Sequence, residues 1–263
     1  MQIIDVNCML GEWAFKNLRF KAPAELLDEM QRLGIVKSLV FSSNSWQNDI
    51  KTGNHQIVEM VKDHAERLLP VAALTPLIRQ EFGGKQPVVD FLTKNHIAAV
   101  RLFPSDHHFS LDLWCMEELF EILDEMHMLV LIEGREQTGS IDSYYQQIYD
   151  LASKHKNVDF VLLTVGYRSL RTIYCLFDNC SNIHIDTSTF ITFRGIEDMV
   201  RYYGSERILF GSRMPFMEAA VSVGRIIYAD IDASHKENIA YRNVLRLLGR
   251  NKNLNVDREA FLV

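Results

Sequence analysis

Leu129-Val130-Leu131-Ile132-Glu133 is an uninterrupted apolar run that ends on a single carboxylate. Short runs of branched aliphatic residues are typical of strands that are buried on both faces in a parallel sheet. Seven further apolar runs occur in the chain, over residues 2–9, 36–42, 68–74, 98–103, 158–164, 182–186 and 207–211. They recur at intervals of roughly 24 to 33 residues, which suits a unit of one strand and one helix. The sequence therefore predicts eight such units.

The segments between these runs have helical periodicity. Apolar residues stand three or four positions apart in Ala24-Leu27-Met30-Leu33 and in Leu113-Met116-Leu119-Phe120-Leu123, which gives a helix one apolar face. Eight buried strands that alternate with helices favour a closed (β/α)8 TIM barrel, with an open doubly wound sheet as the alternative. No Pro/Gly/Ser-rich linker or charge run divides the sequence. We expect one α/β domain, with the barrel over residues 1–249 and a polar C-terminal arm over residues 250–263.

The composition is that of a globular protein with a small-molecule partner. The 263 residues are 48% hydrophobic and 24% charged, which is enough to bury one large core. The formal net charge of −6 argues against nucleic acid or an anionic membrane as a partner, and it leaves a homo-oligomer open. The sequence has neither a basic leader nor an apolar stretch of about 18 residues, so a cytoplasmic location is expected.

Four strand-end segments resemble motifs of the amidohydrolase-related family, a branch of the metal-dependent hydrolases and decarboxylases. These segments are Asp5–Gly11, Leu131–Gly134, Leu163–Gly166 and Ile208–Phe216. The resemblance extends in the same order to residues 100–104 and 243–249, and so covers nearly the whole chain. It implies an amidohydrolase-like barrel of hydrolase ancestry, with its site at the C-terminal ends of the strands.

Five positions in these segments depart from the family pattern. The family usually has His-x-His in the first segment, His in the second and third, and Asp in the fourth. This sequence has Asn7, Met9, Glu133, Thr164 and Arg213 at those places. Only Glu133 is a good ligand for a divalent ion, and the cationic Arg213 would repel one. We therefore expect the inherited metal site to be empty and the protein to use no cofactor.

The charged residues at the strand ends suggest an anion site instead. Arg101, Glu133 and Arg213 together carry a charge of +1, which a small carboxylate-bearing ligand would neutralise. Glu133 is the candidate general acid or base, and Arg213 together with Arg101 would stabilise an anionic transition state. Glu133 and Arg213 are thus the candidate catalytic residues. The candidate ligand-binding residues are Asn7, Arg101, Thr164, Asp186 and His107, and the candidate aromatic walls are Trp13, Phe15 and Trp46.

Three functions fit these residues. The first is a protein that binds a small anion, with hydrolase or lyase activity that needs no metal. The second is an inactive pseudoenzyme that acts as a structural or regulatory subunit. The third is a metal-dependent hydrolase whose ligands have moved to other positions, drawn from Asp106, His107, His108, Glu133 and Asp186. The sequence does not decide between them.

Overall fold

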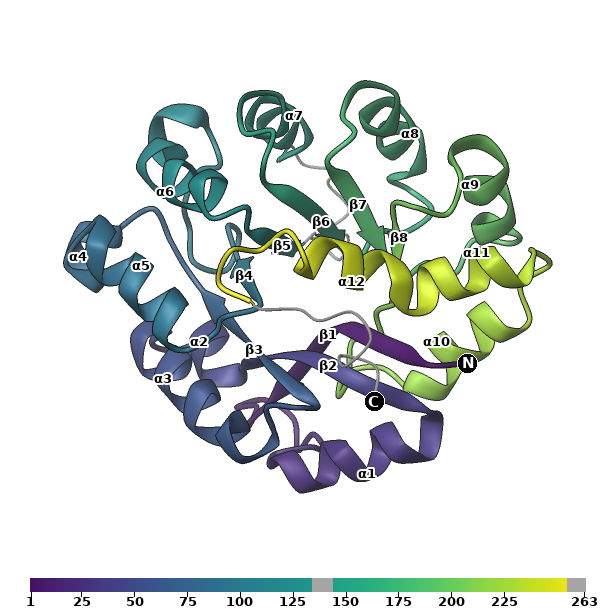
Figure 1. Cartoon of the computed structure of the whole chain (residues 1–263), viewed down its shortest axis with the longest axis horizontal. Helices are drawn as coiled ribbons and strands as arrows, with labels where there is room; N and C mark the ends of the chain where they lie inside the picture. The colour runs from purple at the N-terminus through teal and green to yellow at the C-terminus, as the bar shows by residue number, and fades with distance from the viewer. Residues whose placement is uncertain (134–143, 255–263) are drawn as a thin grey trace.

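The computed structural model describes residues 1–133 and 144–254, and in this part of the chain eight parallel strands form a barrel (Figure 1). The strands are β1 (Ile3–Leu10), β2 (Ile35–Ser42), β3 (Leu68–Ala73), β4 (Ala99–Leu102), β5 (Leu129–Glu133), β6 (Asp159–Leu163), β7 (Ile183–Asp186) and β8 (Ile208–Leu209). Each strand pairs with the next in sequence order. The last strand returns to the first, because the Val6 amide donates to the Phe210 carbonyl oxygen at 3.0 Å. The predicted (β/α)8 barrel is confirmed.

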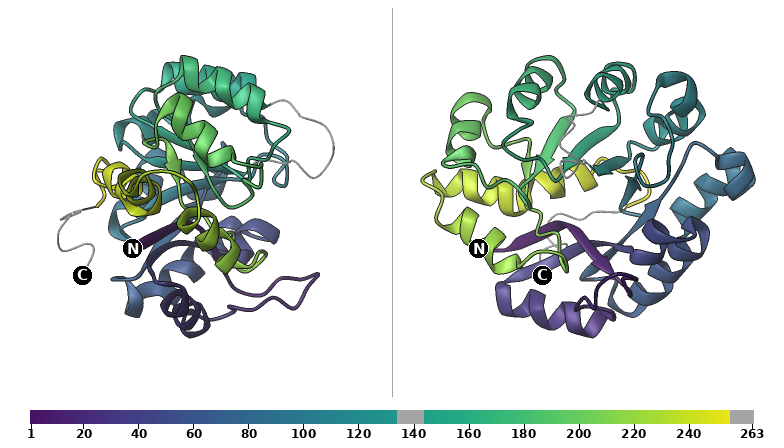
Figure 2. Two further views of the ribbon diagram at one scale, coloured as in Figure 1. Left: turned by 90° about the vertical axis from the view of Figure 1, so that its right-hand side faces the viewer. Right: turned by 180° about the vertical axis from the view of Figure 1, so that it is seen from behind.

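Helices surround the strands in every view (Figure 2). They are α1 (Pro23–Leu33), α2 (Ser43–Gln47), α3 (Ile50–Val61), α4 (Ile78–Phe82), α5 (Lys85–Lys94), α6 (Leu113–Glu125), α7 (Tyr144–Lys154), α8 (Leu170–Asn179), α9 (Gly195–Tyr203), α10 (Ala219–Ile227), α11 (Ala233–Glu237) and α12 (Asn243–Leu248), with short helical turns at Lys62–His64 and Asn238–Arg242. Helix α12 crosses one end of the barrel (Figure 1). None of the described helices is long and apolar enough to cross a membrane.

Strand side chains alternate between two apolar cores, which explains the uninterrupted runs in the sequence. In β5, Leu129 and Leu131 belong to the core inside the barrel, whereas Val130 and Ile132 pack against the helices. Each fully buried aliphatic side chain stabilises the fold by about 1.5–3 kcal/mol. Both faces of the sheet are covered, and the few polar side chains inside the strands, such as Asp5, Ser38 and His184, are buried.

The first residues of the predicted C-terminal arm close the end of the barrel that α12 crosses. Asn251 donates to the carbonyl oxygens of Ile97 at 3.3 Å and Ala98 at 3.1 Å. Arg250 forms an ion pair with Asp159 at 2.8 Å. These contacts lie at the N-terminal ends of the strands, so the opposite end is the one available to a ligand. The rest of the arm, residues 255–263, lies outside the described residues.

Candidate functional site

Glu133 is the centre of a buried charged cluster at the C-terminal ends of the strands. Its Oε2 atom accepts a hydrogen bond from Nη2 of Arg101, and its Oε1 atom lies 3.1 Å from Nη2 of Arg213. The hydroxyl of Thr164 donates to Oε1 at 3.5 Å. The Glu133 side chain is 7% exposed, and two cations face its single negative charge. One carboxylate thus holds two guanidinium groups that come from opposite parts of the barrel.

Arg101 lies deepest in this cluster. Its side chain is 2% exposed, and Nη1 donates to Oδ1 of Asn7 at 2.9 Å. The guanidinium carbon lies 4.1 Å from the ring centroid of Phe41 and 5.2 Å from that of Phe103, within the range of cation–π attraction. Burial lowers the pKa of Arg101, while the charge and hydrogen bond of Glu133 oppose the shift. A guanidinium remains charged under these conditions.

Asp186 fixes the orientation of two members of the cluster. Its Oδ2 atom accepts from Nδ2 of Asn7 at 2.9 Å, and its Oδ1 atom accepts from the backbone amide of Thr164 at 3.0 Å. Because Nδ2 of Asn7 donates to Asp186, the Oδ1 atom of Asn7 is left to accept from Arg101. Burial raises the pKa of Asp186, and hydrogen bonds from Ser188, Asn7 and Thr164 oppose the shift.

The backbone is unusual where two of these side chains leave their strands. Thr164 and Arg213 have φ angles of 58° and 59°, in the left-handed region that residues with a side chain seldom adopt. For a β-branched residue such as Thr164 this conformation is strained. The strain is tolerated because the Asp186 carboxylate holds the Thr164 amide and Glu133 holds both side chains. Both backbones thereby direct a polar side chain at the same carboxylate.

The structure joins six of the seven predicted site residues and leaves one out. Asn7, Arg101, Glu133, Thr164, Asp186 and Arg213 form one connected network. His107 is not part of it, because its Nε2 atom lies 3.0 Å from the carbonyl oxygen of Trp46 in α2, the short helix after β2. Met9, at one of the substituted positions, is 1% exposed and packs in the apolar core inside the barrel.

Aromatic rings cover the cluster, and the sequence analysis identified only some of them. Trp46 stacks on Phe103 with ring centroids 5.0 Å apart, and Trp13 meets Phe216 at 4.9 Å. Phe15, the third expected wall residue, is 88% exposed and was assigned wrongly. Phe103 was missed although a signal existed: it stands two positions after Arg101, so strand alternation turns both side chains inward. Phe216 follows β8 in irregular backbone, where alternation gives no guide.

Comparison with known proteins shows the family. A sequence profile described as Amidohydrolase matches residues 11–250. The chain belongs to the amidohydrolase family. No curated protein matches the sequence significantly.

Similar solved structures include aromatic acid decarboxylases. A 2,6-dihydroxybenzoate decarboxylase from Rhizobium, and an enzyme of the same name complexed with 2,6-dihydroxybenzoate, are each 13% identical, with TM-score 0.75 over 95% of this chain and 99% of theirs. A dihydroxybenzoic acid decarboxylase from Polaromonas sp. JS666 is 14% identical, with TM-score 0.73 over 97% of this chain and 99% of its own. A 5-carboxyvanillate decarboxylase from Novosphingobium aromaticivorans is 12% identical, with TM-score 0.70 over 85% and 79%. At such identities the likeness establishes the shared fold.

These relatives correct the expectation that the protein uses no cofactor. The Polaromonas enzyme has bound manganese, and the Novosphingobium enzyme is complexed with manganese. The prediction of an empty metal site was therefore wrong as an inference from the sequence, because relatives of the same fold use a metal. Five substituted residues do not settle metal use on their own.

The described side chains do not fit a divalent ion in their present arrangement. Within residues 1–133 and 144–254, no three His, Cys, Asp or Glu side chains are grouped so that they could hold a metal. The relocated ligand set of Asp106, His107, His108, Glu133 and Asp186 is accordingly not brought together. The carboxylate of Glu133 is engaged by two arginines, which would have to move before a cation could replace them. In this arrangement the groups available for chemistry are the side chains of the cluster.

Proposed function

We propose that this amidohydrolase-family protein binds a small carboxylate-bearing molecule at the C-terminal mouth of the barrel and acts on it as a hydrolase or lyase. The observation that carries the proposal is one carboxylate, Glu133, shared between two guanidinium groups. Arg101, Arg213 and Glu133 sum to a charge of +1, so an anionic ligand would complete the balance. If Asp186 is ionised the sum becomes zero. Burial raises the pKa of Asp186, so this carboxyl group is more readily protonated than an ordinary carboxyl group.

Arg213 is the group that meets the ligand in this proposal. Its side chain is 16% exposed, against 2% for Arg101, so it is the arginine that an incoming carboxylate reaches first. A guanidinium presents two parallel N–H donors that match a carboxylate. When the ligand takes over Arg213, Glu133 keeps Arg101 as its counter-ion, and its Oε1 atom keeps only the hydrogen bond from Thr164.

Glu133 would then act as the general acid or base. In a hydrolysis it would accept a proton from attacking water and return it to the leaving group. In a decarboxylation the C–C bond to the carboxyl group breaks and the carbon keeps the electron pair. The carbon then takes a proton that Glu133 passes to it from water, and the remaining hydroxide combines with the released CO2 as bicarbonate. The decarboxylase relatives include structures with 2,6-dihydroxybenzoate and with 4-hydroxy-3-methoxy-5-nitrobenzoic acid, which supports an aromatic acid as ligand. The rings of Trp46, Phe103 and Phe216 would provide an apolar wall for it.

A non-catalytic structural or regulatory protein is the second candidate. The observation in its favour is that Asn7, Arg101, Glu133 and Asp186 are already linked to one another by hydrogen bonds, although Nε of Arg101 is buried without a partner among the described residues. A linked network of this kind can serve to fix the strand ends without any ligand.

Ligand binding and turnover together separate the two candidates. A ligand that binds only the native state at one hundred times its Kd adds about 2.7 kcal/mol of stability, so 2,6-dihydroxybenzoate should raise the melting temperature more than 2,6-dihydroxybenzamide. Arg213→Gln should abolish the difference, whereas Arg171→Gln, at an exposed position of α8, should preserve it. Formation of the decarboxylated product, lost in Glu133→Gln with binding retained, would support the enzyme. Binding without turnover across a panel of aromatic acids would favour the second candidate.

A further inference from the structure

A second cavity lies beside the charged cluster at the same end of the barrel. It has a volume of about 690 Å³ and is formed by the loops that follow β2, β3 and β4. Its lining includes Trp46, Asp49, Glu81, Asp106, His107 and Trp114. The proposed anion site does not use any of these polar groups. The proposed anion site therefore does not account for the polar lining of this cavity.

Two aromatic rings separate this cavity from the charged cluster. Trp46 lines the cavity and stacks on Phe103 at 5.0 Å. The ring centroid of Phe103 lies in turn 5.2 Å from the guanidinium carbon of Arg101. A ligand in the cavity would thus meet Trp46 and would not reach Glu133. The two regions are neighbours with a shared wall.

The charge of the cavity is opposite to that of the cluster. Asp49, Glu81 and Asp106 contribute −3 and Lys51 contributes +1, which gives −2. Asp49 caps α3 by accepting from the Thr52 amide at 2.7 Å. Hydrogen bonds from the Thr52 side chain and from its amide lower the pKa of Asp49, so it is ionised at neutral pH. Carboxylates with an excess of negative charge attract a cation.

The uncharged lining also favours a cationic donor. The Nε2 atom of His107 lies 3.0 Å from the Trp46 carbonyl oxygen, and since a carbonyl only accepts, Nε2 carries the proton. In the neutral ring Nδ1 is then an acceptor, but it is buried and has no hydrogen-bond partner among the described residues, so the aromatic lining carries the preference for a cation. Trp114 is 78% exposed on the wall of the cavity. The indole of Trp114 and the three carboxylates line the same cavity, and an exposed indole face can bind an ammonium group by cation–π attraction.

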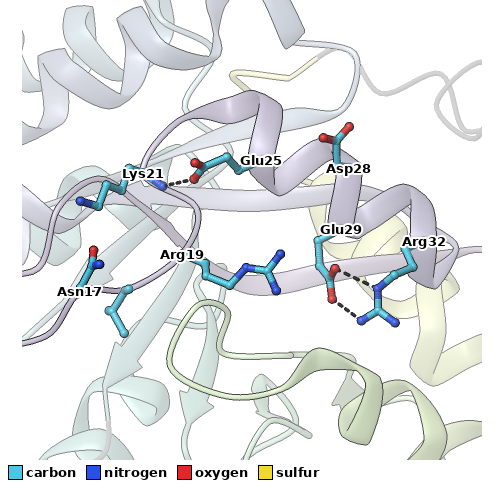
Figure 3. Close-up of a pocket in the computed structure, with 8 residues that line it drawn as sticks. Asn17, Arg19, Lys21, Glu25, Asp28, Glu29 and Arg32 are labelled. Carbon is cyan, nitrogen blue, oxygen red and sulfur yellow. Dashed lines mark hydrogen bonds and ion pairs between the residues drawn. The ribbon is translucent and has the colours of Figure 1, made fainter.

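A surface cavity at α1 shows by contrast what is particular here. It has a volume of about 450 Å³ and is lined by residues of α1 and of the preceding connection (Figure 3). Its charges are Arg19, Lys21 and Arg32 against Glu25, Asp28 and Glu29, which cancel. Arg32 and Glu29 pair with each other, as the dashed lines in Figure 3 show. That cavity has neither an excess charge nor an aromatic lining, and it carries no ligand preference.

We propose that the cavity between the loops after β2, β3 and β4 binds an organic ammonium ion with an apolar body. The ammonium group would lie among Glu81, Asp106 and the indole of Trp114, and the apolar part would lie against Trp46. This site shares the aromatic wall of Trp46 and Phe103 with the proposed carboxylate site but none of its charged residues, so either proposal can fail without the other.

Benzylammonium is the probe, because benzyl alcohol and benzoate have a similar shape without the positive charge. In calorimetric titrations at neutral pH and fixed ionic strength, benzylammonium should bind at least about tenfold more tightly than benzyl alcohol, a difference of about 1.4 kcal/mol. Glu81→Gln with Asp106→Asn should weaken benzylammonium by at least the same factor, and Trp114→Ala should weaken it as well. A spectroscopic check is that chemical shift changes fall on the indole N–H groups of Trp46 and Trp114.

Two controls keep the result specific. Asp28→Asn with Asp63→Asn removes the same charge from exposed positions outside the cavity, and it should leave benzylammonium binding unchanged. Arg213→Gln should likewise leave it unchanged while it reduces carboxylate binding. The proposal is overturned if benzyl alcohol binds as tightly as benzylammonium, if no heat is detected up to saturating concentrations, or if both double variants weaken binding equally.

Discussion

Glu133 and Arg213 form a buried ion pair, with Nη2 of Arg213 3.1 Å from Oε1 of Glu133. The two residues stand at the ends of different strands, and the left-handed backbone of Arg213 directs its side chain inward. Because Arg101 shares the same carboxylate, the pair is one half of a three-residue network. Removal of Glu133 and removal of Arg213 should therefore lower the free energy of unfolding by different amounts.

Replacement of Glu133 should be far more destabilising than replacement of Arg213. Glu133→Gln leaves two buried guanidinium groups without a counter-ion and should cost about 3–5 kcal/mol. Arg213→Met leaves the neutral Arg101–Glu133 pair intact and should cost about 1 kcal/mol. The double variant should show a coupling of about 1–3 kcal/mol. Chemical denaturation measures all three, and additive losses would mean that the two side chains do not act on each other in solution.

Asp186 should make the protein less stable as the pH rises. Because burial raises its pKa in the folded state, the folded state binds more protons than the unfolded state above the ordinary carboxyl pKa of 3.8. The contribution is therefore fully present below that pH and is lost as the pH rises through the folded pKa. The stability advantage of the wild type over Asp186→Asn should shrink from about pH 4 towards neutrality. An advantage that grows over this range would show that the hydrogen bonds from Asn7, Ser188 and Thr164 outweigh burial.

Gly211 should not tolerate a side chain. A Cβ atom there would lie 2.3 Å from Oδ2 of Asp186, so Gly211→Ala would displace the carboxylate that holds Asn7 and Thr164. Overpacking of this kind costs about 1–3 kcal/mol, and anion binding should weaken with it. Gly224→Ala is the matched control: its Cβ would meet only Tyr228 Cδ2 at 3.9 Å, and removal of a helical glycine should stabilise by about 0.5–1 kcal/mol. Equal effects of the two substitutions on the melting temperature would contradict the crowding at Gly211.

Arg213→Asp should raise the affinity for manganese relative to the wild type. The substitution removes a cation that lies 3.1 Å from Glu133 and adds a second carboxylate at the same strand ends. Carboxylate oxygens are suitable ligands for manganese, so an increase of at least about tenfold, or about 1.4 kcal/mol, is expected in a manganese titration followed by electron paramagnetic resonance. Arg171→Asp makes the same charge change on the exposed face of α8 and should have no such effect. Equal manganese affinities of the two variants would show that Arg213 does not control manganese binding.

The alternation of strand and helix follows from local sequence alone. Apolar runs such as Leu129–Ile132 are buried on both faces, and their spacing leaves room for one helix between strands, so a barrel can be predicted without knowledge of any contact. Strand alternation and strand polarity also placed Arg101, Glu133 and Arg213 at the mouth. These properties depend on neighbours within a few residues, so they can be predicted from the sequence.

Only the tertiary structure decided which side chains meet. Asn7 contacts Arg101 across 94 positions and Asp186 across 179 positions, and no local pattern encodes either pairing. His107 falls outside the cluster because the Trp46 carbonyl holds its ring, and Thr164 reaches Glu133 from a left-handed backbone that its residue type disfavours. The sequence by itself determined the barrel and the end at which polar groups gather. Closure of the barrel decided the network, because strand register and strand-end backbone angles set distances of a few ångströms between residues far apart in the chain.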